Sequence, residues 1–110
     1  MACHSVLMNT DEHWSTRTPD LVADVKLYAT REGGKTKAAV LGWGCPCFAT
    51  NDPGEEGWDA RLQLGDEPLI AGAERRIGFV FLSPKGADAM RRAGHFYLWD
   101  GRFVGEATVV

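Results

Sequence analysis

Short apolar runs with a period of two, separated by glycine-containing turns, constrain the fold of this 110-residue chain most strongly. In the first run, Ala23, Val25, Leu27 and Ala29 alternate with residues that are mostly polar. This alternation is typical of a strand that buries one face and exposes the other. A series of such runs predicts an all-β fold.

Further strands and turns follow along the chain. The pair Gly33-Gly34, flanked by charged residues, predicts a hairpin turn over residues 31–35 with a return strand at residues 36–41. Residues 42–58 contain several glycines and prolines, and we expect them to be irregular. The remaining strands are expected at residues 59–64, 76–82, 95–99 and 102–110, with Phe79 and Phe81 as core residues and Asp100-Gly101 as a second hairpin turn.

One short helical segment interrupts the strands. Ser83-Pro84 combines a hydroxyl cap with a proline suited to the first helical position. A turn or two of helix is expected from Ala87 to Arg92, and Gly94 would end it. Six short strands with one stub of helix predict a closed barrel or a sandwich.

Length and composition set further limits. A chain of 110 residues suits one domain, which we divide into a polar N-terminal arm, residues 1–18, and a β domain, residues 19–110. No apolar run is long enough for a membrane helix and no secretory signal is evident, so we expect a cytoplasmic protein without a membrane partner. The net charge of −3 argues against a general nucleic-acid binder, although it leaves room for a local basic patch.

Two motifs have a chemical interpretation that we weigh against a structural one. Residues 29–36 fit a relaxed P-loop, but the glycines and proline that follow leave no room for its helix, so no GTP binding is expected. Cys45 and Cys47, with Cys3, His4 and His13, supply zinc-type ligands, but the single-residue spacing of the cysteines is unusual for zinc. We therefore expect free thiols and no metal or other cofactor.

Five aromatic side chains are candidates for a binding surface. Strand parity places Tyr28, Tyr97 and Trp99 on the face opposite the core residues. Exposed rings on strands suit stacking or protein contact, whereas in a small barrel the loops can also fold over them. Both interpretations remain open for the full set, which is Tyr28, Trp43, Trp58, Tyr97 and Trp99.

The order of the turns resembles that of a known family. Residues 24–28 form a strand motif, Glu32-Gly33-Gly34-Lys35 a turn, and Gly42-Trp43 and Pro46-x-Phe48 follow it. Residues 77–81, Pro84, Gly101-Arg102 and Val104-Gly105 continue the series. Over residues 21–110 this arrangement is similar to the C-terminal (third) domain of elongation factor Tu. It departs from that pattern at residues 44–47, where the family usually carries a basic residue.

The resemblance implies a six-stranded antiparallel closed barrel that is not an enzyme, because the GTPase domain of that factor is missing. In the family this domain helps to hold the T-stem of aminoacyl-tRNA, which implies structured RNA as the partner. A protein-interaction module without RNA is the alternative, and a small metal- or thiol-dependent protein ranks below both. The expected nucleic-acid-binding residues are the basic cluster Arg31, Lys35 and Lys37, and the positions implied by the resemblance, Gly101, Arg102, Val104 and Gly105.

Overall fold

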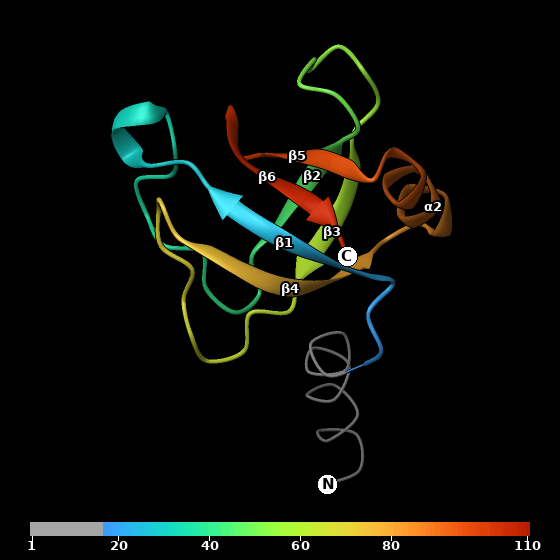
Figure 1. Ribbon diagram of the computed structural model, residues 1–110, viewed down its shortest axis with the longest axis horizontal. Coiled ribbons are helices and arrows are strands. Elements are labelled where there is room, and N and C mark those ends of the chain that lie inside the picture. The colour runs from blue at the N-terminus through green and yellow to red at the C-terminus, as the bar shows by residue number, and fades with distance from the viewer. Residues whose placement is uncertain (1–16) are drawn as a thin grey trace, which may run out of the picture.

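The computed structural model describes residues 17–110 and shows a closed barrel of six antiparallel strands (Figure 1). The strands follow one another around the barrel in the order β1-β4-β3-β2-β5-β6. The predicted all-β barrel is therefore confirmed, and the sandwich is not formed. The elements are β1 (Leu21–Leu27), η1 (Thr30–Glu32), β2 (Gly44–Phe48), β3 (Trp58–Leu62), β4 (Glu74–Phe81), α2 (Pro84–Ala93), β5 (His95–Trp99) and β6 (Phe103–Val109).

The alternation in the sequence determines which face of each strand points inward. In β1, Leu21, Ala23, Val25 and Leu27 are all buried, while the residues between them are exposed or half-buried. β1 pairs with β4 on one side and with β6 on the other, so its inward residues meet those of both neighbours. Burial of this continuous apolar interior supplies the main driving force for folding.

Three phenylalanine rings form the centre of the core. Phe79 and Phe96 are fully buried with their ring centroids 5.2 Å apart, and Phe81 stacks on Phe79 at 6.2 Å. The core role predicted for Phe79 and Phe81 is confirmed. No side chain in residues 17–110 leaves a buried polar atom without a hydrogen-bond partner.

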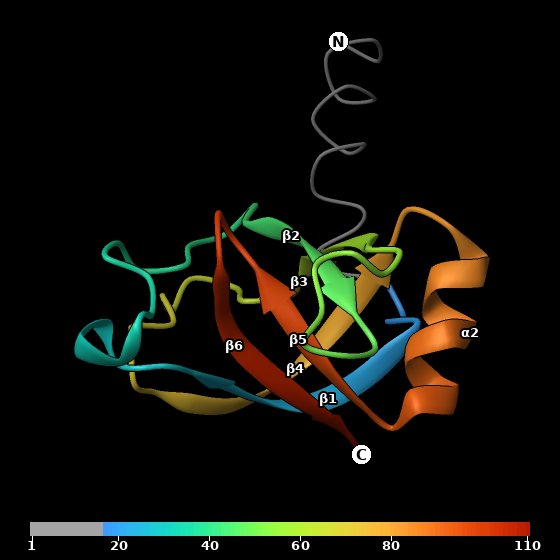
Figure 2. The same cartoon turned by 90° about the horizontal axis from the view of Figure 1, so that it is seen from above.

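Helix α2 lies at the opposite end of the molecule from η1 (Figure 2). The Ser83 side chain caps it by accepting a hydrogen bond from the backbone N–H of Lys85, and Gly94 ends it with φ of 74°. These are the signals seen in the sequence, but the helix of ten residues is longer than the predicted turn or two. Met90 extends from α2 into the core.

The predicted hairpin at residues 31–35 is wrong. Thr30–Glu32 form a 3-10 turn, Gly33 ends it with φ of 95°, and residues 36–41 contribute only one bridge, between Ala39 and Leu69. Both edges of β1 are already paired, with β4 and β6, so no edge remains for a return strand. Gly34 is needed for a different reason: a Cβ there would lie 1.9 Å from the carbonyl oxygen of Tyr28.

The predicted irregular segment 42–58 is also partly wrong, because it contains β2 and the first residue of β3. The proline that argued against a strand is tolerated for a positional reason. Pairing between β2 and β5 involves only Cys47 and Phe48, so Pro46 lies outside that ladder and its missing N–H costs no hydrogen bond there. Residues 49–57 do form an exposed loop, as expected.

Most of the predicted arm lies outside the described residues, which begin at Arg17. From there the chain is tied to the barrel, because the Gln63 side chain donates to the backbone oxygen of Arg17 at 2.9 Å. Arg17 also pairs with Asp20 at 3.0 Å. Within residues 17–110, no helix has the length and apolar character needed to cross a membrane.

Candidate functional site

Two turns that are far apart in the sequence meet beside a pocket of about 200 Å³. The Nζ atom of Lys35 lies 2.7 Å from Oδ2 of Asp100, which joins the turn after η1 to the turn between β5 and β6. Six residues line this pocket, which we call the turn pocket: Lys35, Thr36, Lys37, Asp100, Arg102 and Val104.

Lys35 fastens the two turns together and is not available as a binding cation. Its side chain is only 9% exposed, and its ammonium group also lies 4.9 Å from the ring centroid of Trp43. The hydrogen bond from Lys35 lowers the pKa of Asp100 below its usual value, because the lysine favours the charged carboxylate. The opposite charges of this ion pair offset each other. The positive charge of this site must therefore come from other residues.

Three cations remain for that role. Arg102 and Lys37 are exposed at the turn pocket, and Arg31 is exposed on η1, which precedes the same turn. None of the three forms an ion pair with another residue in the described part of the chain. Of the four cations among the predicted binding residues, Arg31, Lys35, Lys37 and Arg102, only Lys35 is thus removed from the candidates.

The other predicted positions have different surroundings. Gly101 is exposed at the hairpin turn with φ of 75°, a conformation that favours glycine. The side chain of Val104 is 1% exposed and belongs to the core. Gly105 is buried where β6 closely approaches β1, since a Cβ there would lie 2.7 Å from the carbonyl oxygen of Lys26. Val104 and Gly105 therefore offer no exposed side chain for binding, and they pack inside the barrel.

A row of aromatic rings covers the outer surface beside this hairpin. We call it the aromatic stripe, and its members are Phe48, Tyr97, Trp99 and Phe103. Phe103 contacts the other three, with ring centroids 5.5 Å from Phe48, 5.9 Å from Tyr97 and 4.9 Å from Trp99. The predicted outward placement of Tyr97 and Trp99 is confirmed by the alternating burial of β5. Phe103 was not among the predicted aromatic residues. It precedes Val104 in the predicted last strand, so an inward Val104 would have placed Phe103 on the outer face.

A hydrogen-bonded group of polar side chains extends the stripe. Glu106 accepts a hydrogen bond from the Tyr28 hydroxyl at 3.1 Å and lies 3.0 Å from Nε2 of His95. Burial, and then the hydrogen bond with Glu106, raise the pKa of Tyr28 to about 12. The remaining ring nitrogen of His95 lies 3.0 Å from the Thr108 hydroxyl. Both histidine nitrogens are therefore occupied by structural partners.

The other aromatic candidates serve the fold. Trp43 packs against the core and receives the Lys35 ammonium group on its ring. Trp58 also packs against the core and leaves no room beside Gly86, where a Cβ would lie 2.8 Å from the Trp58 Cβ. The structural interpretation therefore holds for Trp43 and Trp58, while Tyr97 and Trp99 stay candidates for a binding surface.

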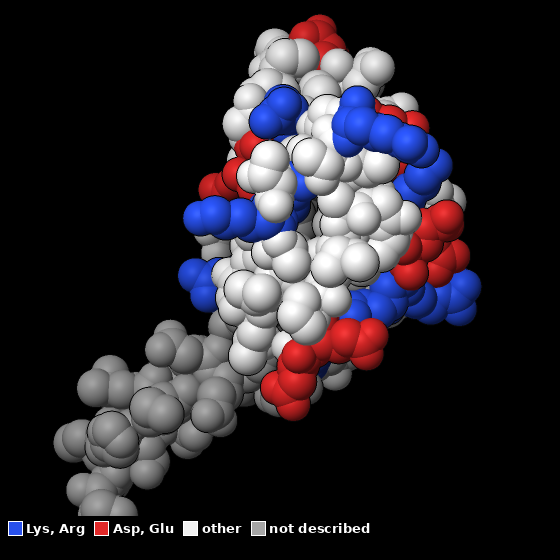
Figure 3. Space-filling model, turned by 90° about the vertical axis from the view of Figure 1, so that its left-hand side faces the viewer, with Lys and Arg blue, Asp and Glu red and all other residues white. Residues whose placement is uncertain are grey.

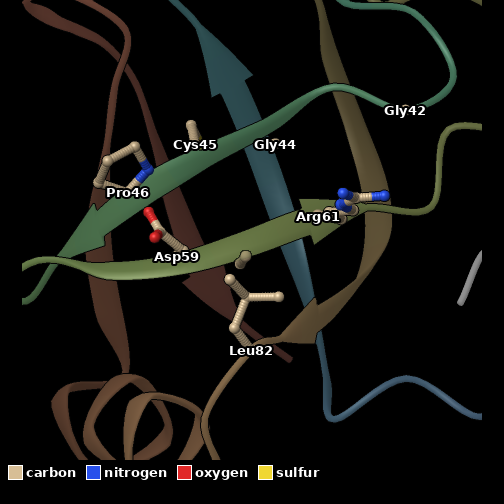
Figure 4. A pocket seen from close by; sticks show the side chains of 8 residues that line it. Gly42, Gly44, Cys45, Pro46, Asp59, Arg61 and Leu82 are labelled. Carbon is tan, nitrogen blue, oxygen red and sulfur yellow. The ribbon is translucent and has the colours of Figure 1, made fainter.

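A second hollow, of about 330 Å³, lies over β2 and β3 (Figure 4). Asp59 and Arg61 project from β3 at this hollow, and Leu82 approaches from the end of β4. Gly44 leaves the backbone bare here, because a Cβ would come within 2.9 Å of the carbonyl oxygen of Ala60. Because Asp59 is negative and Arg61 positive, the charge of this hollow favours neither an anionic nor a cationic ligand.

The two cysteines of β2 are buried in the core. Both are free thiols, and desolvation raises the pKa of Cys47 well above its usual value, which makes this thiol unreactive. Within residues 17–110, no group of three or more His, Cys, Asp or Glu side chains is arranged to hold a metal ion. Cys3, His4 and His13 lie outside the described residues.

The segment that resembled a P-loop, residues 29–36, consists of η1 and its closing turn. No helix occurs between Lys35 and β2, so the helix N-terminus that would bind phosphates in a true P-loop is not formed there. In comparisons with known proteins, no protein-family model matches the chain, and no curated protein matches it significantly.

Proposed function

We propose that this chain is a non-catalytic binding module, similar to the third domain of elongation factor Tu, and that it binds structured RNA at the turn pocket. One observation carries the proposal. The Lys35–Asp100 ion pair, between residues 65 positions apart, brings Lys37 and Arg102 to the same pocket. Exposed cations that are not already paired are the groups that bind phosphate.

The overall charge limits how such binding works. With a net charge of −3, the field of the whole protein repels RNA at long range. Affinity must then come from a few local phosphate contacts, and the candidates are Arg31, Lys37 and Arg102. A site with three contacts gives a log-log dependence of affinity on salt with a slope of about −2 to −3.

The test measures binding of a fluorescently labelled RNA stem-loop by anisotropy as the salt concentration rises from about 50 to about 200 mM. The dependence of affinity on salt over this range gives the slope. Arg102→Glu should weaken binding of every sequence alike, because phosphate contacts position the protein without reading bases. The matched control is Arg92→Glu on α2, at the other end of the barrel, which changes the net charge equally. Equal weakening by both substitutions, or binding that ignores salt, would contradict the proposal.

The alternative, a protein-interaction module, has its own supporting observation. Val40, Leu41 and Ile70 are 52%, 52% and 61% exposed, and they lie on two turns joined by the Ala39–Leu69 bridge. Figure 3 views this end of the molecule and shows a surface that is largely uncharged in its centre, with charged side chains toward its edges. An apolar centre with a polar rim is the usual anatomy of a protein interface. If the RNA stem-loop does not bind at low salt while Val40→Asp lowers the molecular mass in solution, this alternative is preferred.

A further inference from the structure

The aromatic stripe is a sheet surface on which Tyr97, Trp99 and Phe103 keep contact with solvent, whereas Phe48 is only 8% exposed and lies beneath the end of the loop 49–57. Its rings lie on the outside of β5 and at the adjoining ends of β2 and β6, while α2 contacts β3, β4 and β5 (Figure 2). Tyr97, Trp99 and Phe103 are all half-buried, so each ring keeps part of its surface open to solvent. Aromatic side chains are the ones most enriched at protein interfaces.

An acidic loop borders this stripe. Residues 49–57 are all exposed and contain Asp52, Glu55 and Glu56 but no Lys or Arg. The loop leaves β2 directly after Phe48 and returns over the same ring, because a Cβ at Gly57 would lie only 2.6 Å from Cζ of Phe48. The loop that carries the three carboxylates therefore begins and ends at the Phe48 end of the stripe, and it projects from the barrel there (Figure 1).

A fourth carboxylate lies within the stripe itself. Glu106 is directly opposite Tyr97 in the pairing of β5 with β6, and its side chain is 34% exposed. None of the loop carboxylates forms an ion pair with a described residue. The stripe is thus bordered by negative charge on the loop side, and the nearest cation in sequence, Arg102, faces the turn pocket.

We propose that the aromatic stripe and the loop 49–57 together dock an arginine-bearing segment of a partner protein. Aromatic faces attract cations, and a guanidinium group stacks on a ring while it donates hydrogen bonds to neighbouring carboxylates. The same carboxylates repel the phosphates of RNA, so a cationic protein segment fits this surface better than a nucleic acid does. This site is separate from the RNA site proposed above and takes a ligand of the opposite charge.

A defined probe tests the proposal: a fluorescein-labelled peptide of alternating arginine and glycine, with alternating lysine and glycine for comparison. Anisotropy should show binding at low salt, with the arginine peptide bound more tightly, because the planar guanidinium stacks on rings. Trp99→Leu should weaken arginine-peptide binding by about two- to fivefold, the size expected for an exposed cation–π contact.

The charge contribution has a matched control. The combined substitution Asp52→Asn, Glu55→Gln and Glu56→Gln should weaken binding by at least about threefold, and this loss should shrink as salt rises. The control neutralises Asp66, Glu67 and Glu74, which lie at and after the turn between β3 and β4. Neither set touches the core, and thermal melts by circular dichroism verify that both variants fold.

Three results would overturn the proposal. The arginine peptide could fail to bind at low salt, or the two triple variants could weaken it equally, which would indicate attraction to the net charge alone. In the third case a single-stranded oligouridine binds, loses affinity in Trp99→Leu and gains affinity when the loop is neutralised, which would make the stripe a base-stacking surface. Arg102→Glu separates the two sites, since it should weaken RNA binding and leave arginine-peptide binding unimpaired.

Discussion

The two faces of strand β5 both carry large side chains with an aromatic ring, but they differ in burial and in polar groups. Phe96 and Leu98 point inward and are completely buried, while Tyr97 and Trp99 point outward and are half-buried. The inner pair has only apolar atoms and is held by packing on all sides. The outer pair carries a hydroxyl and an indole N–H, groups that can bind water or a partner. The inward aromatic ring of β5 therefore stabilises the barrel core, while the outward rings form a surface that solvent can reach.

The largest expected effect comes from removing a ring on the inner face. Phe96→Ala or Phe79→Ala should lower the free energy of unfolding by about 3–5 kcal/mol, because each leaves a cavity in the centre of the core. Tyr97→Ala on the outer face should cost about 1 kcal/mol or less, the value of a cross-strand pair. Urea denaturation followed by circular dichroism measures both, and equal losses would remove the distinction between the faces.

A smaller effect is expected where two strands approach closely. Gly105→Ala places a methyl group 2.7 Å from the carbonyl oxygen of Lys26 and 2.9 Å from Leu27 Cδ2. The forced separation of β1 from β6 should cost about 1–3 kcal/mol. Gly101→Asn is the control, because nothing lies within 4 Å of a Cβ at that position and asparagine tolerates positive φ. If the control is as destabilising as Gly105→Ala, the close approach is not the cause.

The hydrogen bond from Tyr28 to Glu106 on the outer face of the barrel should be detectable when the absorbance of the protein is followed against pH. The pKa of Tyr28 is raised to about 12 by burial and by Glu106, so the folded state favours the neutral phenol. Its contribution to stability is present below the unfolded pKa of about 10 and is lost as the pH rises through 12. Ultraviolet absorbance of phenolate should show a step near pH 12 that Tyr28→Phe abolishes. The chain has only two tyrosines, so a spectrum unchanged by this substitution would contradict the assignment.

The smallest effect is expected at the ion pair that joins the two turns. Lys35 lowers the pKa of Asp100, so this contribution to stability is present above the unfolded pKa of about 4 and is lost as the pH falls through the folded value. The Asp100 side chain is 46% exposed, and solvent screening limits the contribution to about 1 kcal/mol or less. Asp100→Asn should therefore flatten the acid side of the stability profile, measured by urea denaturation from pH 6 down to about 3.

The predictions made from local pattern succeeded where the pattern was complete. Alternation over residues 95–99 and the Asp100-Gly101 turn predicted the β5–β6 hairpin and the outward direction of Tyr97 and Trp99. Ser83 and Gly94 correctly marked the two ends of α2. Each of these signals acts within a few residues, so no knowledge of distant neighbours was needed.

The turn at Gly33-Gly34 shows where local reasoning failed. A glycine pair permits positive φ, and this is equally useful in a hairpin and in the end of a 3-10 turn. Which one forms depends on whether β1 has an edge available, and both edges are occupied by β4 and β6. β2 was missed for a related reason, because Pro46 is harmless only where no β5 partner requires its N–H.

The candidate site likewise combines features that local sequence predicts with contacts that depend on the tertiary structure. The sequence by itself determined the all-β class, the inward and outward faces of its strands, and the presence of basic residues on two turns, because period and residue type are local properties. Only the tertiary structure decided that the two turns meet, that Asp100 neutralises Lys35, and that Phe48 and Phe103 join Tyr97 and Trp99 in one stripe. The contacts of Lys35 with Asp100 and of Phe48 with the β5–β6 hairpin depend on which turns and strands the barrel brings together. Strand order around a barrel is not encoded in the alternation of any single strand.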